Sequence, residues 1–141
     1  MEWMLLPYRR YADFSGRSRR MEYRMYRLFE FGVVIVWVVL AGVLSGTAGT
    51  VGGDTAGGIV GSLSGLLIIL FALFSFIPGL AVTVRRLHDT NRSGWFILIS
   101  LIPLVGSIVL LVFLFSEGTR GPNNYGEDPK ALHEHAGDVF S

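Results

Sequence analysis

The 141-residue sequence contains no cysteine, and only 16% of its residues are charged. Without cysteine the chain can form no disulfide, no cysteine-ligated zinc site and no catalytic thiolate. Two long stretches, 55–84 and 93–116, contain no Asp, Glu, Lys or Arg, and a third uncharged stretch covers 31–53. Hydrophobic residues make up 51% of the chain. This composition is too apolar for an ordinary soluble domain and indicates a membrane protein.

The uncharged stretches are long enough to supply membrane helices, which need about 20 apolar residues each. We expect an all-α membrane protein with three spans, at about 31–46, 59–84 and 95–115. The third span would be about 31 Å long, which matches a hydrocarbon core of about 30 Å, and Pro103 should bend it. The expected domains are a basic cytoplasmic or interfacial segment over 1–30, a membrane domain over 31–116 and a polar tail over 117–141.

Basic residues are concentrated near the N-terminus, where seven of the twelve precede residue 28. The pattern over 15–30 is typical of an amphipathic helix, because Arg17, Arg20, Arg24 and Arg27 recur at helical spacing on one face. We expect this helix to lie in the membrane interface, where an arginine near an anionic leaflet contributes roughly 1 kcal/mol. These arginines could bind headgroups or a partner, or they could only fix the topology.

The distribution of charge also predicts the orientation in the membrane. The N-terminal segment carries seven arginines and the 85–94 loop carries three, whereas the glycine-rich connection over 45–58 carries no basic residue. Short segments rich in Lys and Arg stay in the cytoplasm. We therefore expect a cytoplasmic N-terminus and a cytoplasmic 85–94 loop, and three spans then place the C-terminal tail on the opposite side.

Glycines four residues apart occur in both of the first two apolar stretches. They are Gly42 and Gly46 in the first stretch, and Gly57, Gly61 and Gly65 in the second. Small residues at this spacing form a groove in which two membrane helices can approach closely. The pattern predicts helix packing, either within the chain or with another subunit. The alternative is a flexible loop whose glycines extend into the start of a helix.

The segment from Arg85 to Trp95 is a charge-dense island between two apolar stretches. Its three arginines, Arg85, Arg86 and Arg92, could together hold a phosphate, because guanidinium groups match phosphate oxygens. Glu22 in the N-terminal segment could instead pair with these arginines.

His88 and Asp89 in this island suggest catalysis or metal binding. A catalytic triad needs a nucleophile beside the base, however, and a metal site needs further ligands. The other histidines, His133 and His135, are expected across the membrane. We therefore expect Asp89 to accept hydrogen bonds from arginines or backbone amides, and His88 to be an interfacial structural residue.

Three motifs together resemble a bacterial inner-membrane family called Domain of Unknown Function 805. They are Phe14-Ser15-Gly16-Arg17-x-Arg19-Arg20-x-Glu22-Tyr23, then Arg85-Arg86-Leu87-His88-Asp89-x-x-Arg92-Ser93-Gly94-Trp95, and then Gly121-x-Asn123-x-Tyr125-Gly126-x-Asp128-Pro129. The family usually has Trp after Glu-Tyr, whereas Arg24 follows Tyr23 here. The resemblance implies a multi-span protein of the inner membrane and brings no established activity and no catalytic residues. If the third motif lies with the other two, the tail is cytoplasmic and one apolar stretch is re-entrant.

We expect a small non-enzymatic accessory or assembly subunit of a larger inner-membrane complex, without metal, cofactor or nucleic acid. The alternative is a module that binds anionic lipids, and a small transporter or membrane enzyme has less support, because no charged residue lies within a span. The candidate lipid- or partner-binding residues are Arg17, Arg19, Arg20, Glu22, Arg85, Arg86, His88, Asp89, Arg92 and Trp95.

Overall fold

The computed structural model describes residues 2–130, and these residues are helical apart from loops and one isolated bridge between Asn123 and Gly126. The helices are α1 (Glu2–Arg9), α2 (Arg20–Asp89), the 3-10 helix η1 (Gly94–Leu101) and α3 (Val105–Phe115). His133 and His135 lie outside the described residues. The chain forms two compact units. The terminal unit joins the N-terminal residues up to Tyr26 with the chain from Ile77 onward, and the middle unit is Arg27–Phe76.

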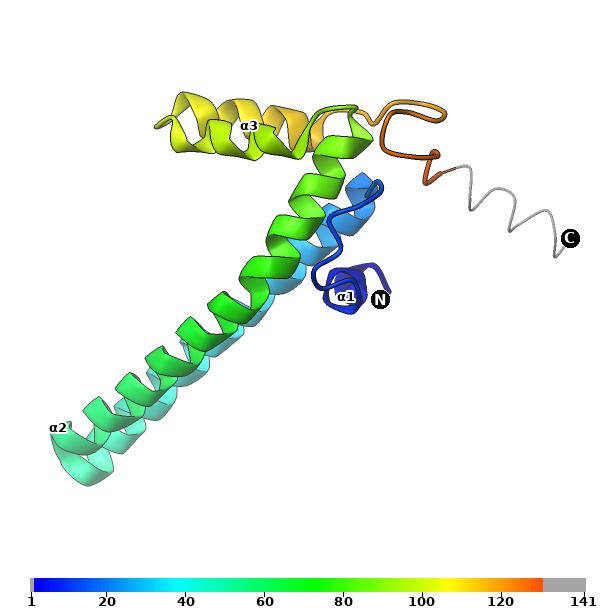
Figure 1. The fold of residues 1–141 in the computed structure, drawn as a ribbon. Coiled ribbons are helices and arrows are strands. Elements are labelled where there is room, and N and C mark those ends of the chain that lie inside the picture. Colours follow the sequence, from blue (N-terminus) through cyan, green and yellow to red (C-terminus); the bar gives the residue numbers. More distant parts are fainter. Residues whose placement is uncertain (1, 131–141) are drawn as a thin grey trace, which may run out of the picture. The chain divides into compact units, whose positions relative to one another are not determined.

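The middle unit consists of two antiparallel arms of α2, which reverse direction at Gly53 (Figure 1). Gly53 has φ 78° and ψ 176°, a backbone conformation that glycine adopts without steric cost. The glycine-rich connection expected over 45–58 is therefore helical on both sides of this single residue. Among the described helices, only α2 is long and apolar enough to cross a membrane, and each arm exceeds the ~20 residues that one span needs.

Three close contacts hold the two arms of the middle unit together. The indole of Trp37 donates a hydrogen bond to the carbonyl oxygen of Ser64 at 3.2 Å. A Cβ added at Gly57 would lie 2.9 Å from the carbonyl oxygen of Ser45, and one at Gly61 would lie 3.3 Å from the Ser45 hydroxyl. Part of the glycine pattern thus packs within the chain. A Cβ at Gly42, Gly46 or Gly65 would meet nothing within 4 Å.

The terminal unit has a small mixed core, built from both ends of the chain. Its buried apolar members are Tyr23, Tyr26, Val82, Leu87 and Leu114, with Tyr8, Ile97, Leu110 and Phe113 packed against them. The Tyr8 and Tyr26 rings are 5.4 Å apart, and Tyr23 meets Phe115 edge-on at 6.5 Å, which ties the start of α2 to both α1 and α3.

The helix expected over 15–30 begins later than predicted. Residues 12–19 are not helical, and α2 starts at Arg20. Arg17 therefore does not share a helix face with Arg20 and Arg24, and its side chain is buried. The physical reason is a set of long-range hydrogen bonds to Arg17, described below, that an exposed helical residue could not make.

The third apolar stretch does not form the single helix expected over 95–115. It forms η1 and α3, which pack against one another as a hairpin (residues 94–115, hereafter the apolar hairpin; Figure 1). Pro103 disfavours a helical conformation of Ile102, whose backbone is extended, and Leu104 adopts φ 63°. A Cβ at Gly106 would lie 1.7 Å from the carbonyl oxygen of Ile99, so only glycine allows this close approach. The proline produces a reversal where we expected a bend.

Candidate functional site

A buried cluster of Arg17, Arg86 and Asp89 (hereafter the arginine–aspartate cluster) lies at the centre of the terminal unit. Arg17 Nε donates to Asp89 Oδ1 at 3.0 Å, and Arg86 Nη1 donates to Asp89 Oδ2. The three side chains are at most 7% exposed. Each carboxylate oxygen thus accepts a hydrogen bond from one arginine, and Asp89 is an acceptor of arginine hydrogen bonds as we expected.

Backbone carbonyls of the tail and of the end of α3 accept further hydrogen bonds from the two arginines. Arg17 donates to the carbonyls of Thr119 and Gly121, the latter at 2.7 Å. Arg86 donates to the carbonyls at the end of α3 and just beyond it, at Leu114 (2.9 Å) and Ser116. The Thr119 amide in turn donates to the Asp89 carbonyl at 2.8 Å. Buried charges that are paired and hydrogen-bonded in this way fix a conformation and are not available to a ligand.

The tail is thereby held against the N-terminal segment and the end of α2. We expected the tail to lie across the membrane from the N-terminal segment, but Thr119 and Gly121 of the tail are in direct contact with Arg17. The apolar hairpin makes this contact possible, because it returns the chain to Arg86 near the end of α2.

Arg85 and Glu22 form a second buried ion pair, with 3.2 Å between Arg85 Nη2 and Glu22 Oε1. The Arg85 carbonyl also accepts a hydrogen bond from the Ser18 amide at 3.1 Å. Arg85 Nε and Nη1 have no hydrogen-bond partner within the described residues. This pair therefore joins the N-terminal segment to the end of α2, as the sequence suggested, but with fewer hydrogen bonds than the arginine–aspartate cluster.

His88 is stacked on Tyr125, with ring centroids 3.9 Å apart and an angle of 4° between the planes. Its Nδ1 lies 3.2 Å from the Gly16 carbonyl, and its own carbonyl accepts a hydrogen bond from Asn123 at 2.9 Å. Burial lowers the pKa of His88, so the neutral ring is favoured in the fold. His88 thus contacts residues from the first and third motifs, and all three motifs meet in the terminal unit.

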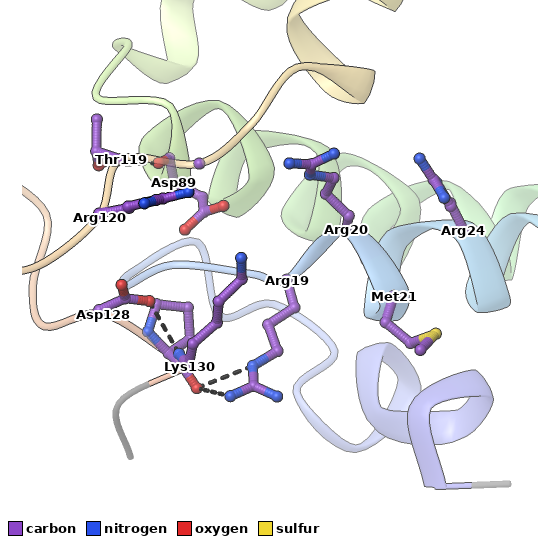
Figure 2. A pocket seen from close by; sticks show the side chains of 11 residues that line it. Arg19, Arg20, Met21, Arg24, Asp89, Thr119, Arg120, Asp128 and Lys130 are labelled. Atoms are coloured by element: carbon purple, nitrogen blue, oxygen red, sulfur yellow. Dashed lines mark hydrogen bonds between the residues drawn. The ribbon is translucent and has the colours of Figure 1, made fainter. Parts of the chain in front are cut away.

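A cationic cleft of about 510 Å³ lies beside the arginine–aspartate cluster (Figure 2). Five basic side chains line it against two carboxylates, those of Asp89 and Asp128. The basic residues are Arg19, Arg20, Arg24, Arg120 and Lys130, and Met21, Gly118, Thr119 and Pro129 complete the wall. This volume is within the range of small-molecule sites, about 300–1,000 Å³.

Two segments that are far apart in the sequence form the cleft. Figure 2 shows Arg20 and Arg24 at the start of α2 and Arg120 and Lys130 on the tail. Arg19, just before α2, donates to the Pro129 carbonyl at 2.9 Å, and this bond joins the two segments. The cleft exists only when the tail is in place.

The residues that line the cleft differ from the phosphate-binding set that the sequence suggested. Arg85 and Arg86 are buried and paired, and Arg92 lies over the Phe113 ring at 3.9 Å. Trp95 is 78% exposed. Arg19 and Arg20 do line the cleft. The tail residues were not among the predicted site residues, and the third motif, which ends next to Lys130, is the signal that could have led to them.

The contacts of the His88 ring are stacking on Tyr125 and an approach of Nδ1 to the Gly16 carbonyl. Within residues 2–130, no group of three His, Asp or Glu side chains is placed to hold a metal ion. A carboxylate bound by two arginines and a cleft lined with cations are features of a binding or structural site.

Two apolar helical arms, each long enough to cross a bilayer, are typical of an integral α-helical membrane protein. The chain belongs to the family of proteins of unknown function DUF805, whose sequence model matches residues 11–127. Similar relatives are the inner membrane proteins YhaI and YhaH of Escherichia coli K12. YhaI is 40% identical over 130 residues, which cover 92% of this chain and 97% of YhaI. YhaH is 39% identical over 92% of this chain and 98% of its own length.

These relationships confirm the family resemblance and the bacterial inner membrane as the location. No solved structure matches the chain significantly.

Proposed function

We propose that this inner-membrane protein binds the phosphate-containing headgroups of anionic lipids, and that the cationic cleft is the site. The observation that carries the proposal is the excess of basic over acidic side chains around a cleft of ligand size. Arginine is well suited to this ligand, because its planar fork of N–H donors matches phosphate oxygens. The cleft also adjoins the apolar hairpin through the segment from Ser116 to Thr119, so a lipid headgroup can reach it.

The cations of the cleft differ in how easily a ligand could engage them. Arg20 pairs with Glu117 at 2.6 Å, but Glu117 is 71% exposed, and an exposed pair exchanges readily for another anion. The Arg24 guanidinium lies 5.4 Å from the centre of the Phe115 ring, which leaves its edge open to a second contact. By contrast, the Asp89 charge is already compensated by two buried arginines.

Paired substitutions with equal charge test the proposal. The cleft variant is Arg24→Gln with Arg120→Gln, and the control is Arg9→Gln with Arg27→Gln, which removes two exposed charges elsewhere. At roughly 1 kcal/mol per arginine, the cleft variant should lose about thirtyfold in affinity for a short-chain phosphatidylglycerol added to zwitterionic nanodiscs. Equal losses in the two variants would indicate diffuse attraction and overturn the proposal. Binding of inorganic phosphate alone would show whether the glycerol and acyl parts contribute.

The accessory-subunit hypothesis has its own support in the middle unit. Gly42 and Gly46 leave a strip of backbone with nothing near it, and such a strip accepts a second helix in lipid. Native mass spectrometry of the protein extracted from its own membrane separates the two functions. Retained anionic lipid on a lone chain supports headgroup binding, whereas a defined assembly with other subunits favours the accessory function. An enzyme or transporter has less support. The ring of His88, the histidine nearest to a catalytic arrangement, is stacked on Tyr125 and lies against the Gly16 carbonyl.

A further inference from the structure

The apolar hairpin is exposed to an extent that water would not tolerate. Trp95, Leu101, Leu104 and Val105 are 78%, 77%, 81% and 63% exposed, and residues 93–116 contain no charged side chain. Soluble monomers rarely expose so large a contiguous apolar surface. Because this surface is not confined to one face of either helix, a single groove on a partner protein would leave part of it in water. Lipid hydrocarbon covers all faces.

The length of the hairpin matches one leaflet and not the whole bilayer. Eight residues of 3-10 helix at about 2.0 Å each give η1 a length of about 16 Å. Eleven residues at about 1.5 Å each give α3 the same length of about 16 Å. Half of a hydrocarbon core of about 30 Å is about 15 Å. Two arms of equal length therefore reach the middle of the membrane at the turn around Leu104.

Three amides of the turn donate to carbonyls within the hairpin, as entry into hydrocarbon requires. The amide of Ile102 donates to the Ile99 carbonyl, and the amide of Val105 donates to the Pro103 carbonyl at 2.7 Å. Gly106 donates back to Ile102 at 3.0 Å, and Pro103 has no amide proton. An unsatisfied amide in lipid costs several kcal/mol, so a reversal at this depth needs such internal pairing.

Both ends of the hairpin are fixed to the same polar region. At its start, Arg92 lies over the ring of Phe113 on α3. At its end, Arg86 donates to the carbonyls of Leu114 and Ser116. Arg86 and Arg92 lie on either side of the tight turn that closes α2, so the chain enters and leaves the membrane at one place.

We infer that the apolar hairpin is a re-entrant element, inserted among the acyl chains of the leaflet next to the terminal unit without crossing the bilayer. The chain then crosses the membrane twice, through the two arms of α2, and the tail up to residue 130 lies on the same side as Arg17. This topology places all twelve Lys and Arg residues on one side, which the positive-inside rule identifies as the cytoplasm. A third complete span would have placed Arg120 and Lys130 outside.

Cysteine accessibility tests the inference directly, because the natural chain has no cysteine. Three single variants are needed: Val51→Cys at the turn of the middle unit (Val51 is 91% exposed), Leu104→Cys at the tip of the hairpin, and Glu127→Cys on the tail. A membrane-impermeant maleimide is applied to intact spheroplasts and to inside-out vesicles. We expect Val51→Cys to react only in spheroplasts, Glu127→Cys only in vesicles, and Leu104→Cys in neither until detergent is added.

Each other pattern overturns the inference. Reaction of Glu127→Cys in spheroplasts would mean a complete third span. Reaction of Leu104→Cys in vesicles would mean that the hairpin lies on the membrane surface. Leu101→Cys, also near the tip, provides a second probe if Leu104→Cys is not inserted into membranes. A nitroxide at either position should be at least as inaccessible to aqueous nickel chelates as one at Leu66 in the middle unit. The outcome is independent of whether the cationic cleft binds lipid.

Discussion

Replacing Asp89 by asparagine keeps the shape of the side chain and removes the charge that Arg17 and Arg86 share. In the native protein, Oδ1 accepts from Arg17 and Oδ2 accepts from Arg86. The amide of asparagine has one oxygen and one NH₂ group. Whichever way the amide is turned, one of the two guanidinium groups faces a donor, and two buried cations are left without an anion.

The burial of this cluster sets the size of the effect. The side chains of Arg17, Arg86 and Asp89 are 1%, 0% and 7% exposed, so water solvates the two arginines only slightly once the negative charge is lost. Removing one partner of a buried pair costs about 3–5 kcal/mol, because the remaining charge stays buried and uncompensated. The carbonyls of Thr119 and Leu114 still accept from the arginines, so we expect the lower part of this range.

Equilibrium unfolding by SDS in mixed micelles, followed by circular dichroism, measures this loss. The matched control is Glu30→Gln, which also removes one carboxylate from an arginine pair, since Arg27 and Glu30 are 2.7 Å apart. The Arg27 side chain is 46% exposed, and exposed pairs contribute about 0–1 kcal/mol. An Asp89→Asn variant that unfolds at the same SDS fraction as Glu30→Gln would refute the argument that the cluster stabilises the terminal unit.

Two further predictions concern the turn of the apolar hairpin and the effect of pH. Gly106→Ala should lower stability by about 1–3 kcal/mol in the same assay, because the new methyl group would overlap the Ile99 carbonyl. The control is Gly65→Ala, because there is open space around Gly65. Equal unfolding midpoints for the two variants would show that η1 and α3 are not in contact in the membrane. Burial lowers the pKa of His88, which lies outside the uncharged apolar stretches. Stability should therefore be full above about pH 6.5 and fall as the pH drops toward the folded-state pKa. His88→Phe keeps a ring against Tyr125 and should lose this part of the pH dependence, whereas unchanged pH profiles would contradict it.

The sequence predicted those features that depend on local composition. The uncharged stretches indicated membrane helices, and α2 contains both of the first two expected spans. We expected Asp89 to accept hydrogen bonds from arginines or backbone amides, and one of its two arginine partners, Arg86, is three residues away on the same helix. We also considered that Glu22 could pair with the arginines of the 85–94 loop, and Arg85 is its partner.

The sequence was misleading where contacts between distant residues override a local pattern. Arg17 fits the helical spacing of Arg20 and Arg24, yet carbonyls about a hundred residues later keep it out of the helix. Residues 95–115 have the length and hydropathy of a span. A single proline, Pro103, is compatible both with a bend in one helix and with a reversal of the chain. The decisive signal was Gly106, three residues after Pro103, but its meaning depends on the distance to Ile99, which the sequence does not contain.

The separation between Arg17 and its partners has a consequence for the synthesis of the protein. The carbonyls of Thr119 and Gly121 follow Arg17 by 102 and 104 residues. At about 5–20 residues per second, a ribosome needs roughly 5–20 s to make that interval. During this time both arms of α2 can enter the membrane, while Arg17, Arg85 and Arg86 remain hydrated among the headgroups. The last quarter of the chain then closes over the first, so an interrupted translation product is left inserted but unfinished, with its central arginines open to water.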